Sequence, residues 1–323
     1  MTSCSIVIPV YNRAPLTDRC LTALDKSLPP NAEIEVVVVD DASSDSTRSV
    51  LADHRDFVRV IRRDANGGFA AACNTGFAAS SGEWLVFFNN DLVPEPGWLE
   101  ALFECAARRT QAGVIGSKLL FPNGTIQHAG VVISRELTPR HVYAGFPADH
   151  PAVNKSREFQ IVTGACALVR REVFADAGGF DTAFANGYED VDLCLRLRRL
   201  GLEVHYCHMS VLHHLETATR GLLEDQDLQN FNLFSERWAD EIYQDDLNYY
   251  QEDGLLEIVY REHYPAILSV SPDLAVLADG RASETERALA TRSQQVYDAR
   301  KENRDLHIEL LEANYRVKRA QAE

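Results

Sequence analysis

The sequence lacks several features that would each identify a class of protein. No apolar run approaches the roughly 18 residues that a membrane-spanning helix requires. No basic segment precedes the apolar N-terminus, so we expect no signal peptide. The GxGxxG turn of dinucleotide-binding proteins is absent, and so is the Gly-Lys-Ser/Thr sequence of P-loop proteins. These absences argue against a nicotinamide-dependent dehydrogenase and against a P-loop NTPase.

Paired cysteines and a basic excess are also missing. None of the 7 cysteines forms a CxxC pair, and several lie in apolar runs, where a free thiol behaves as a small hydrophobic group. We therefore expect a reducing compartment, the cytoplasm, and peripheral contact with the inner face of a membrane stays an open alternative. The net charge of -16 argues against a nucleic-acid partner, because nucleic-acid-binding proteins usually present a basic face.

The first 120 residues do contain a regular alternation of strand and helix patterns. Apolar runs predict strands at residues 5–10, 34–39, 57–61 and 83–88, and helical spacing predicts helices between them. Strands separated by helices favour parallel pairing. We therefore expect an α/β fold with a mostly parallel, Rossmann-like central sheet flanked by helices.

The remaining sequence suggests a division into four parts. We expect a catalytic domain over residues 1–215, a helical acceptor-side region over 216–265 and a linker over 266–282. The segment 283–323 has no glycine or proline, and a row with a seven-residue period runs through it: Leu289, Val296, Asn303, Leu310 and Val317. This pattern fits either a coiled coil that would form a homodimer or a single helix packed on its own domain.

Polar side chains follow three of the predicted strands at the points where these strands end. They are Tyr11 and Asn12, Asp40 and Asp41, and Asn89, Asn90 and Asp91. The carboxyl ends of parallel strands lie along one edge of a sheet, which is where ligands bind in open α/β folds. A carboxylate flanked by amides could hold Mg²⁺ or Mn²⁺ there, or it could belong to an ordinary turn.

Two further clusters carry potential chemistry. Glu189, Asp190 and Asp192 mark the start of a predicted helix. The helix dipole stabilises negative charge at that point, but a carboxylate between a loop and a helix could also accept the proton of a substrate hydroxyl. His213 and His214 end a later strand, where a histidine could be a metal ligand or a structural residue.

These segments together resemble the family 2 inverting glycosyltransferases with the GT-A fold, in the branch that includes rhamnosyltransferases. The resemblance covers about residues 3–245. It rests on SIVIPVYNR, VVVDDASSDST, NGGFAAACNTGFAASSGEWLVFFNNDLVPEPGWLE, GTIQHAG, VTGACALVRREVFADAGGFD, YEDVDLCLRLRRLG and VLHH. It implies an enzyme of class EC 2.4 that moves a sugar from a UDP- or dTDP-sugar to a hydroxyl of a saccharide or glycolipid, in polysaccharide or glycoconjugate synthesis.

The same resemblance implies roles for individual residues. Asp190 would be the catalytic base, with Glu189 beside it. Asp91 would hold Mn²⁺ or Mg²⁺ together with His213 or His214, and His213 is the preferred choice; Asn89 replaces the first aspartate of the family's DxD motif. The residues implied to bind the nucleotide sugar are Pro9, Tyr11, Arg13, Asp40, Asp41, Asn66, Gly68, Phe69, Asn74, Asn89, Asn90, Gly164 and Ala165.

Two other functions are compatible with parts of the pattern. A sugar-1-phosphate nucleotidyltransferase would normally carry a basic, glycine-rich loop after the first strand, where this chain has PVYNRAP. A non-catalytic module that dimerises through residues 283–323 is the second alternative. The presence of Asp91, Asp190 and His213 argues against such a module.

Overall fold

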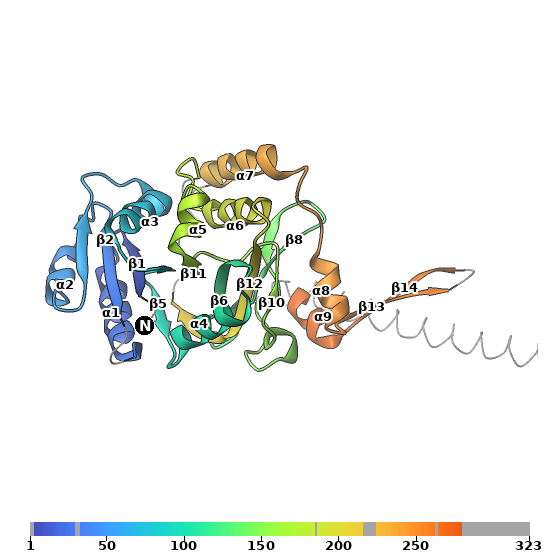
Figure 1. Cartoon of the computed structure of the whole chain (residues 1–323). Coiled ribbons are helices and arrows are strands. Elements are labelled where there is room, and N and C mark those ends of the chain that lie inside the picture. The colour runs from blue at the N-terminus through green and yellow to red at the C-terminus, as the bar shows by residue number, and fades with distance from the viewer. Residues whose placement is uncertain (1–2, 30–32, 185, 216–223, 262–263, 280–323) are drawn as a thin grey trace, which may run out of the picture. The chain divides into compact units, whose positions relative to one another are not determined.

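The chain forms two compact units, Met1–Asp253 and Gly254–Glu323, and each is considered by itself. A computed structural model describes residues 3–29, 33–184, 186–215, 224–261 and 264–279 (Figure 1). The segment for which a coiled coil is predicted, 283–323, lies outside the described residues, so the predicted homodimer stays a prediction.

A large sheet forms the centre of the first unit. Four parallel strands occupy one half of this sheet in the order β3, β2, β1, β4: Arg59–Arg62, Ile34–Asp40, Cys4–Val10 and Trp84–Phe88. Strand β2 contains four consecutive valines, which favour strands and suit a strand that is covered on both faces. The predicted α/β fold with a mostly parallel sheet is therefore confirmed.

The other half of the sheet brings distant segments next to β4. Strand β11 (Cys166–Arg170) is antiparallel to both β4 and β6 (Ala112–Leu120), and β6 is parallel to β12 (Glu203–His214). Three short strands complete this half: β5 (Leu92–Pro94), β7 (Ile126–His128) and β10 (Arg157–Glu158). Because β5 pairs with the end of β12, His213 and His214 lie beside the segment that follows Asp91.

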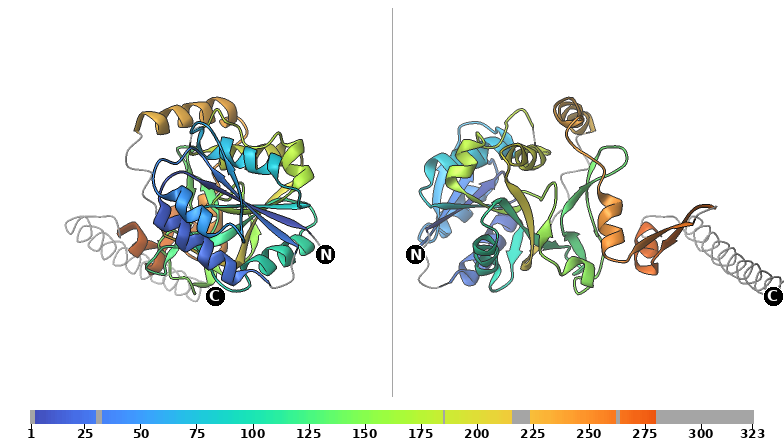
Figure 2. Two further views of the ribbon diagram at one scale, coloured as in Figure 1. Left: turned by 90° about the vertical axis from the view of Figure 1, so that its left-hand side faces the viewer. Right: turned by 45° about the vertical axis from the view of Figure 1, so that its right-hand side comes forward.

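Helices cover both faces of the sheet (Figures 1 and 2). One face carries α1 (Ala14–Ser27), α2 (Thr47–Asp53) and α4 (Trp98–Arg108). The opposite face carries α3 (Gly68–Ala79), α5 (Arg171–Asp176) and α6 (Glu189–Arg199). Side chains alternate along each strand, so one strand serves both layers: Val38 of β2 packs toward α1, and Val39 packs toward α3.

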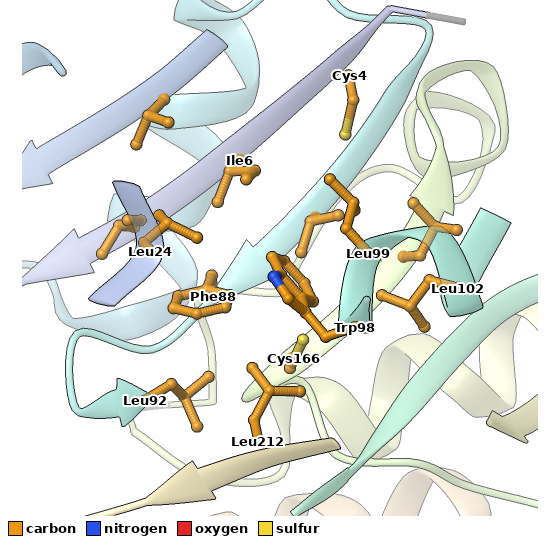
Figure 3. Packing of buried hydrophobic residues seen from close by; sticks show 14 of the residues in the cluster. Cys4, Ile6, Leu24, Phe88, Leu92, Trp98, Leu99, Leu102, Cys166 and Leu212 are labelled. Atoms are coloured by element: carbon orange, nitrogen blue, oxygen red, sulfur yellow. The ribbon is translucent and has the colours of Figure 1, made fainter. Parts of the chain in front are cut away.

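Trp98 of α4 lies in the middle of the main core (Figure 3). Its ring packs against Phe88 of β4, with ring centroids 5.2 Å apart, and its indole nitrogen donates a hydrogen bond to Ser27 of α1. Leu92, the first residue of β5, and Leu212, near the end of β12, belong to the same core. Each such side chain contributes about 1.5–3 kcal/mol by burial, so the core fixes the strand ends firmly.

The rest of the first unit lies around β12 and α6. It consists of β8 (Val131–Ile133), β9 (Pro139–His141), a 3-10 turn (Pro151–Val153), α7 (Glu224–Trp238) and α8 (Asp246–Glu252). No helix among the described residues is long and apolar enough to cross a membrane. The 7 cysteines are all buried and free.

The second unit differs from the linker that the sequence suggested over residues 266–282. It contains an antiparallel hairpin of β13 (Leu256–Arg261) and β14 (Tyr264–Val270), followed by α9 (Pro272–Asp279). Leu268 pairs with Ile258 across the hairpin. Residues 264–270 therefore form a paired strand, which the amino-acid composition of this stretch did not indicate. Pro272 lies in the first turn of α9, a position where proline favours a helix instead of interrupting it.

Candidate active site

The ends of β1 and β2 are joined by polar contacts. The backbone N–H of Asn12 donates to the hydroxyl of Ser43 at 2.8 Å, and the Asn12 side-chain oxygen accepts from the N–H of Ser44 at 2.8 Å. Tyr11 is half exposed beside this junction and is free to contact a planar ligand. Pro9, in contrast, is buried within β1 opposite Val39.

Asp40 and Arg13 also lie where the ends of β1 and β2 meet. Asp40 is buried, forms an ion pair with Arg62 and accepts a hydrogen bond from the N–H of Ser43 at 2.8 Å. Arg13 has a positive φ of 61° and precedes the first residue of α1. The charge of Asp40 is thus neutralised within the protein.

Asp41 organises the turn that leads into α3. It is buried, pairs with Arg63 and accepts hydrogen bonds from the N–H groups of Gly67 at 3.0 Å and Gly68 at 2.9 Å. The Asn66 side chain accepts from Gly68 as well, at 3.0 Å. These N–H groups are occupied by side chains, so the turn does not present them to a phosphate.

This turn is also bonded to the loop before α6. The N–H of Phe69 donates to the side chain of Asn186 at 3.0 Å, across 117 positions of sequence. Gly68 has a positive φ of 80°, and a β-carbon added there would lie 3.0 Å from the Asn186 side chain. Asn186 was not among the predicted site residues, although its loop was recognised.

Asn74 of α3 has a supporting position. Its amide nitrogen donates to the carbonyl of Phe180 at 2.8 Å, and its amide oxygen accepts from the Phe180 N–H at 2.9 Å. Both ends of the amide are therefore used to hold the segment after α5. The nucleotide-binding role implied for Asn74 stays a prediction.

The end of β4 leaves polar atoms without partners. The backbone N–H of Asn89 donates to the carbonyl of Ala165 at 2.8 Å, but the side-chain oxygen of Asn89 is buried and has no hydrogen-bond partner. Asn90 donates to Thr17 of α1 at 2.9 Å. A buried polar atom without a partner costs about 1–3 kcal/mol, so the free oxygen of Asn89 points to a missing ligand.

Asp91 is the second such position. Its Oδ1 is buried and has no hydrogen-bond partner, although Nε2 of His214 lies only 3.0 Å away. The other ring nitrogen of His214, Nδ1, lies 2.6 Å from the side-chain oxygen of Gln127. Asp91 and His214 are therefore close together, without the geometry of a hydrogen bond between them.

His213 lies elsewhere. Its Nε2 is 3.1 Å from a carboxylate oxygen of Glu95, near the surface. Neighbouring residues of a strand point to opposite faces, so only one of the two histidines can face Asp91. The placement favours His214 as a ligand, whereas the sequence interpretation preferred His213.

Asp190 lies at the start of α6, facing the loop before β11. Its carboxylate accepts from the N–H of Gly164 at 2.8 Å and from the N–H of Val191 at 2.8 Å. A β-carbon at Gly164 would lie 3.0 Å from that of Asp190, so only glycine allows this approach without movement. The contacts Asn89–Ala165 and Gly164–Asp190 join the end of β4 to the start of α6.

The other two carboxylates of this cluster are buried. Glu189 accepts from the N–H of Gly187 at 2.6 Å, and burial, followed by the charge of Asp190, raises the pKa of Glu189 to about 8. Asp192 accepts from Arg196 at 2.7 Å and from Arg237 at 2.6 Å. Asp192 thus anchors α7 to α6, and Glu189 is neutral near pH 7.

Two groups that follow β4 and one at the end of β12 match the chemistry of a divalent cation. Asp91 and Asn89 offer unpartnered oxygens, and His214 offers an imidazole nitrogen 3.0 Å from the Asp91 carboxylate. Oxygen ligands suit Mg²⁺ and Mn²⁺. Among the described residues no group of three or more His, Cys, Asp or Glu side chains could hold a metal ion by itself. Asp91, Asn89 and His214 therefore fit part of the ligand set of such an ion.

The architecture matches that of GT-A glycosyltransferases. The crystal structure of GalNAc-T7 with UDP, GalNAc and Mn²⁺ aligns with 75% of this chain and 49% of that one, with a TM-score of 0.62 and 16% identity. The mannosyltransferase PcManGT from Pyrobaculum calidifontis, in complex with GDP-Man and Mn²⁺, aligns with 92% and 84%, with a TM-score of 0.56 and 20% identity. At such identities the likeness shows the fold.

Sequence comparison gives the family. The profile described as "Glycosyl transferase family 2" matches residues 5–178, more than half of the chain. The protein belongs to this family of glycosyltransferases, which are enzymes of class EC 2.4, and the predicted class of enzyme is thereby confirmed.

Two curated relatives illustrate the family. The O-antigen biosynthesis protein RfbC of Myxococcus xanthus is 34% identical over 67% of this chain, but the match spans only 17% of that longer protein. The N-acetylglucosaminyl-diphospho-decaprenol L-rhamnosyltransferase of Mycobacterium tuberculosis is 28% identical over 66% of this chain and 76% of its own.

Proposed function

We propose that the protein is a metal-dependent, inverting glycosyltransferase that moves a sugar from a UDP- or dTDP-sugar to a hydroxyl of a saccharide or glycolipid acceptor. The observation that carries this proposal is the link between the end of β4 and Asp190 through Gly164 and Ala165. It joins the residues with unpartnered oxygens to a carboxylate at a loop–helix junction.

Asp190 would act as the base. Its oxygens are held by the N–H groups of Gly164 and Val191, and no arginine or lysine pairs with it in the part of the chain that the structure describes. It would accept the proton of the acceptor hydroxyl while that oxygen attacks the anomeric carbon from the face opposite the leaving group. A single displacement of this kind inverts the anomeric configuration.

Glu189 would support this base. Burial, followed by the charge of Asp190, raises the pKa of Glu189 and so favours its protonated form. Its side chain is buried and bonded to Gly187, which fits a positioning role.

Asp91 and His214 would hold the cation, with Asn89 beside them. The bound ion would neutralise charge on the departing nucleoside diphosphate. Tyr11, which is half exposed at the end of the neighbouring strand β1, would contact the nucleotide base. One relative is an O-antigen biosynthesis protein and the other acts on a diphospho-decaprenol-linked sugar, which supports a polysaccharide or a lipid-linked saccharide as the acceptor.

A donor screen tests the proposal. Purified protein is mixed with UDP- and dTDP-sugars and Mn²⁺, and sugar release or transfer is followed with and without EDTA. We expect turnover that EDTA removes, and NMR of the product should show the inverted anomer. Asp91→Asn should lose the response to Mn²⁺. Turnover that resists EDTA, or a retained configuration, would contradict the proposal. Release of pyrophosphate from a nucleoside triphosphate in the presence of a sugar-1-phosphate would indicate a nucleotidyltransferase instead.

A further inference from the structure

Gln127 is the residue that contacts His214 from the side opposite Asp91. It lies in the middle of β7, within the GTIQHAG segment, and its side chain is almost completely buried. Strand β7 pairs with β6, and β6 pairs with β12, so three strands hold Gln127 against His214. The distance between Gln127 Oε1 and His214 Nδ1 is 2.6 Å.

This contact determines which nitrogen of His214 carries the proton. An amide oxygen can only accept a hydrogen bond, so the facing Nδ1 must donate. In the neutral imidazole the other nitrogen, Nε2, then has a free lone pair. Nε2 is the atom that lies 3.0 Å from Asp91 Oδ1.

His214 Nε2 and Asp91 Oδ1 lie 3.0 Å apart without the alignment of a hydrogen bond, and Oδ1 has no hydrogen-bond donor. With the proton on Nδ1, Nε2 and this carboxylate oxygen are two acceptors at close range. Two acceptors this close repel each other unless a positive species lies against both of them. In the opposite tautomer, Nε2 would carry a proton toward Asp91, and the Gln127 oxygen would face a lone pair.

We propose that Gln127 is a positioning residue that fixes the tautomer and ring orientation of His214, so that Nε2 is available to a divalent cation. The inference rests on the proposed metal site of Asp91 and His214. Such outer partners of a metal-binding histidine typically change metal affinity by about 10–100-fold when they are replaced. Gln127 would thus belong to the metal site without touching the ion.

A purely structural role of Gln127 makes different predictions. If it only fills space, Gln127→Met, which keeps the length of the side chain, should preserve the site. Gln127→Glu keeps an acceptor oxygen opposite Nδ1. It should preserve the metal site if the hydrogen bond to Nδ1 is what Gln127 contributes. Ile126→Val, on the same strand, is the control for a small loss of packing, which costs about 0.5–1.5 kcal/mol.

The first test reads the tautomer in the metal-free protein. Long-range ¹H–¹⁵N NMR spectra distinguish the two nitrogens of a histidine ring, and a His214→Ala sample identifies the signal. We expect the Nδ1–H form in the wild type, in Gln127→Glu and in Ile126→Val, and a shift toward the Nε2–H form in Gln127→Met. An unchanged tautomer in Gln127→Met would overturn the inference.

The second test measures Mn²⁺ binding by calorimetry in the presence of UDP and, separately, of dTDP. Gln127→Met should weaken the affinity about 10–100-fold, while Gln127→Glu and Ile126→Val should stay within a few-fold of the wild type. If Asp91→Asn and His214→Ala lose Mn²⁺ but Gln127→Met retains it, the metal site stands and the role of Gln127 is wrong. If the wild type binds no Mn²⁺ with either nucleotide, both proposals fail.

Discussion

The carboxylates in the two halves of the candidate site differ in whether a basic side chain pairs with them. At the end of β2, Asp40 and Asp41 are buried and each pairs with an arginine, Arg62 and Arg63. At the end of β4 and the start of α6, Asp91 and Asp190 have no arginine or lysine partner among the described residues. Acidic residues at neighbouring strand ends thus have different electrostatic surroundings.

This difference distinguishes carboxylates that stabilise the fold from carboxylates that can bind a ligand. A buried carboxylate that an arginine neutralises is stabilised within the fold and has little capacity left for a proton or a cation. A carboxylate with only N–H donors, or with none, keeps its charge available for a ligand. Under the proposed function, the β2 half would support the donor-binding side of the site and the β4 half would supply its reactive groups.

The largest expected effect belongs to Asp190. Asp190→Asn keeps an oxygen to accept from Gly164 but cannot take a proton, so kcat should fall by about 10²–10⁴. Thermal unfolding and Mn²⁺-dependent nucleotide binding should stay close to those of the wild type. Asp176→Asn, an exposed change at the end of α5, is the control. Near wild-type turnover in Asp190→Asn would remove this residue from the mechanism.

The next effect should be one of stability, in the β2 half. Arg63→Met leaves the buried Asp41 carboxylate with only the N–H donors of Gly67 and Gly68. We expect a loss of about 1–3 kcal/mol in the free energy of unfolding, because a buried charge loses its partner. Urea denaturation measures it, with Arg55→Met, an exposed arginine, as the control.

The corresponding change in the β4 half should cost no stability. Asp91→Asn removes a charge that has no hydrogen-bond partner at the buried Oδ1, so the free energy of unfolding of the metal-free protein should stay unchanged or rise by up to about 1–3 kcal/mol. Urea denaturation at pH 8, in EDTA, is the appropriate measurement. A loss as large as that of Arg63→Met would contradict the division into two halves.

The last prediction concerns the pH dependence of stability. The pKa of Glu189 is raised to about 8 from an ordinary 4.5, so the folded state holds a proton that the unfolded state releases between these values. The stability contributed by the protonated form is complete below about pH 4.5 and is lost as the pH rises through about 8. Glu189→Gln should flatten this decline in urea titrations, whereas exposed Glu100→Gln should follow the wild type.

Sequence patterns were sufficient for the sheet and for the strand ends. The valine run of β2 and the apolar run of β4 are long, continuous and followed by polar clusters, so both their strand character and their shared edge could be inferred. Asp190 was also placed correctly at a loop–helix junction. These inferences depend on local periodicity, which the folded structure preserves.

The choice between His213 and His214 could not be read in the same way. Strand β12 has an irregularity in its pairing with β6 between Cys207 and Val211, and a bulge changes which residues face a given side. Gln127 was missed because its contact with His214 spans 87 positions and involves two strand pairings. Its position in GTIQHAG, just before His128, was the signal available.

The buried cysteines have a practical consequence for such measurements. A thiol that solvent cannot reach reacts with a soluble disulfide reagent only after the surrounding structure opens. Cys20 of α1 donates to the carbonyl of Asn89, and Cys166 of β11 pairs with Phe88, so both lie at the end of β4. The labelling rate of the untagged, unmutated chain therefore reports how often its interior is exposed, and slower labelling with Mn²⁺ and nucleotide would show that the ligands keep it closed.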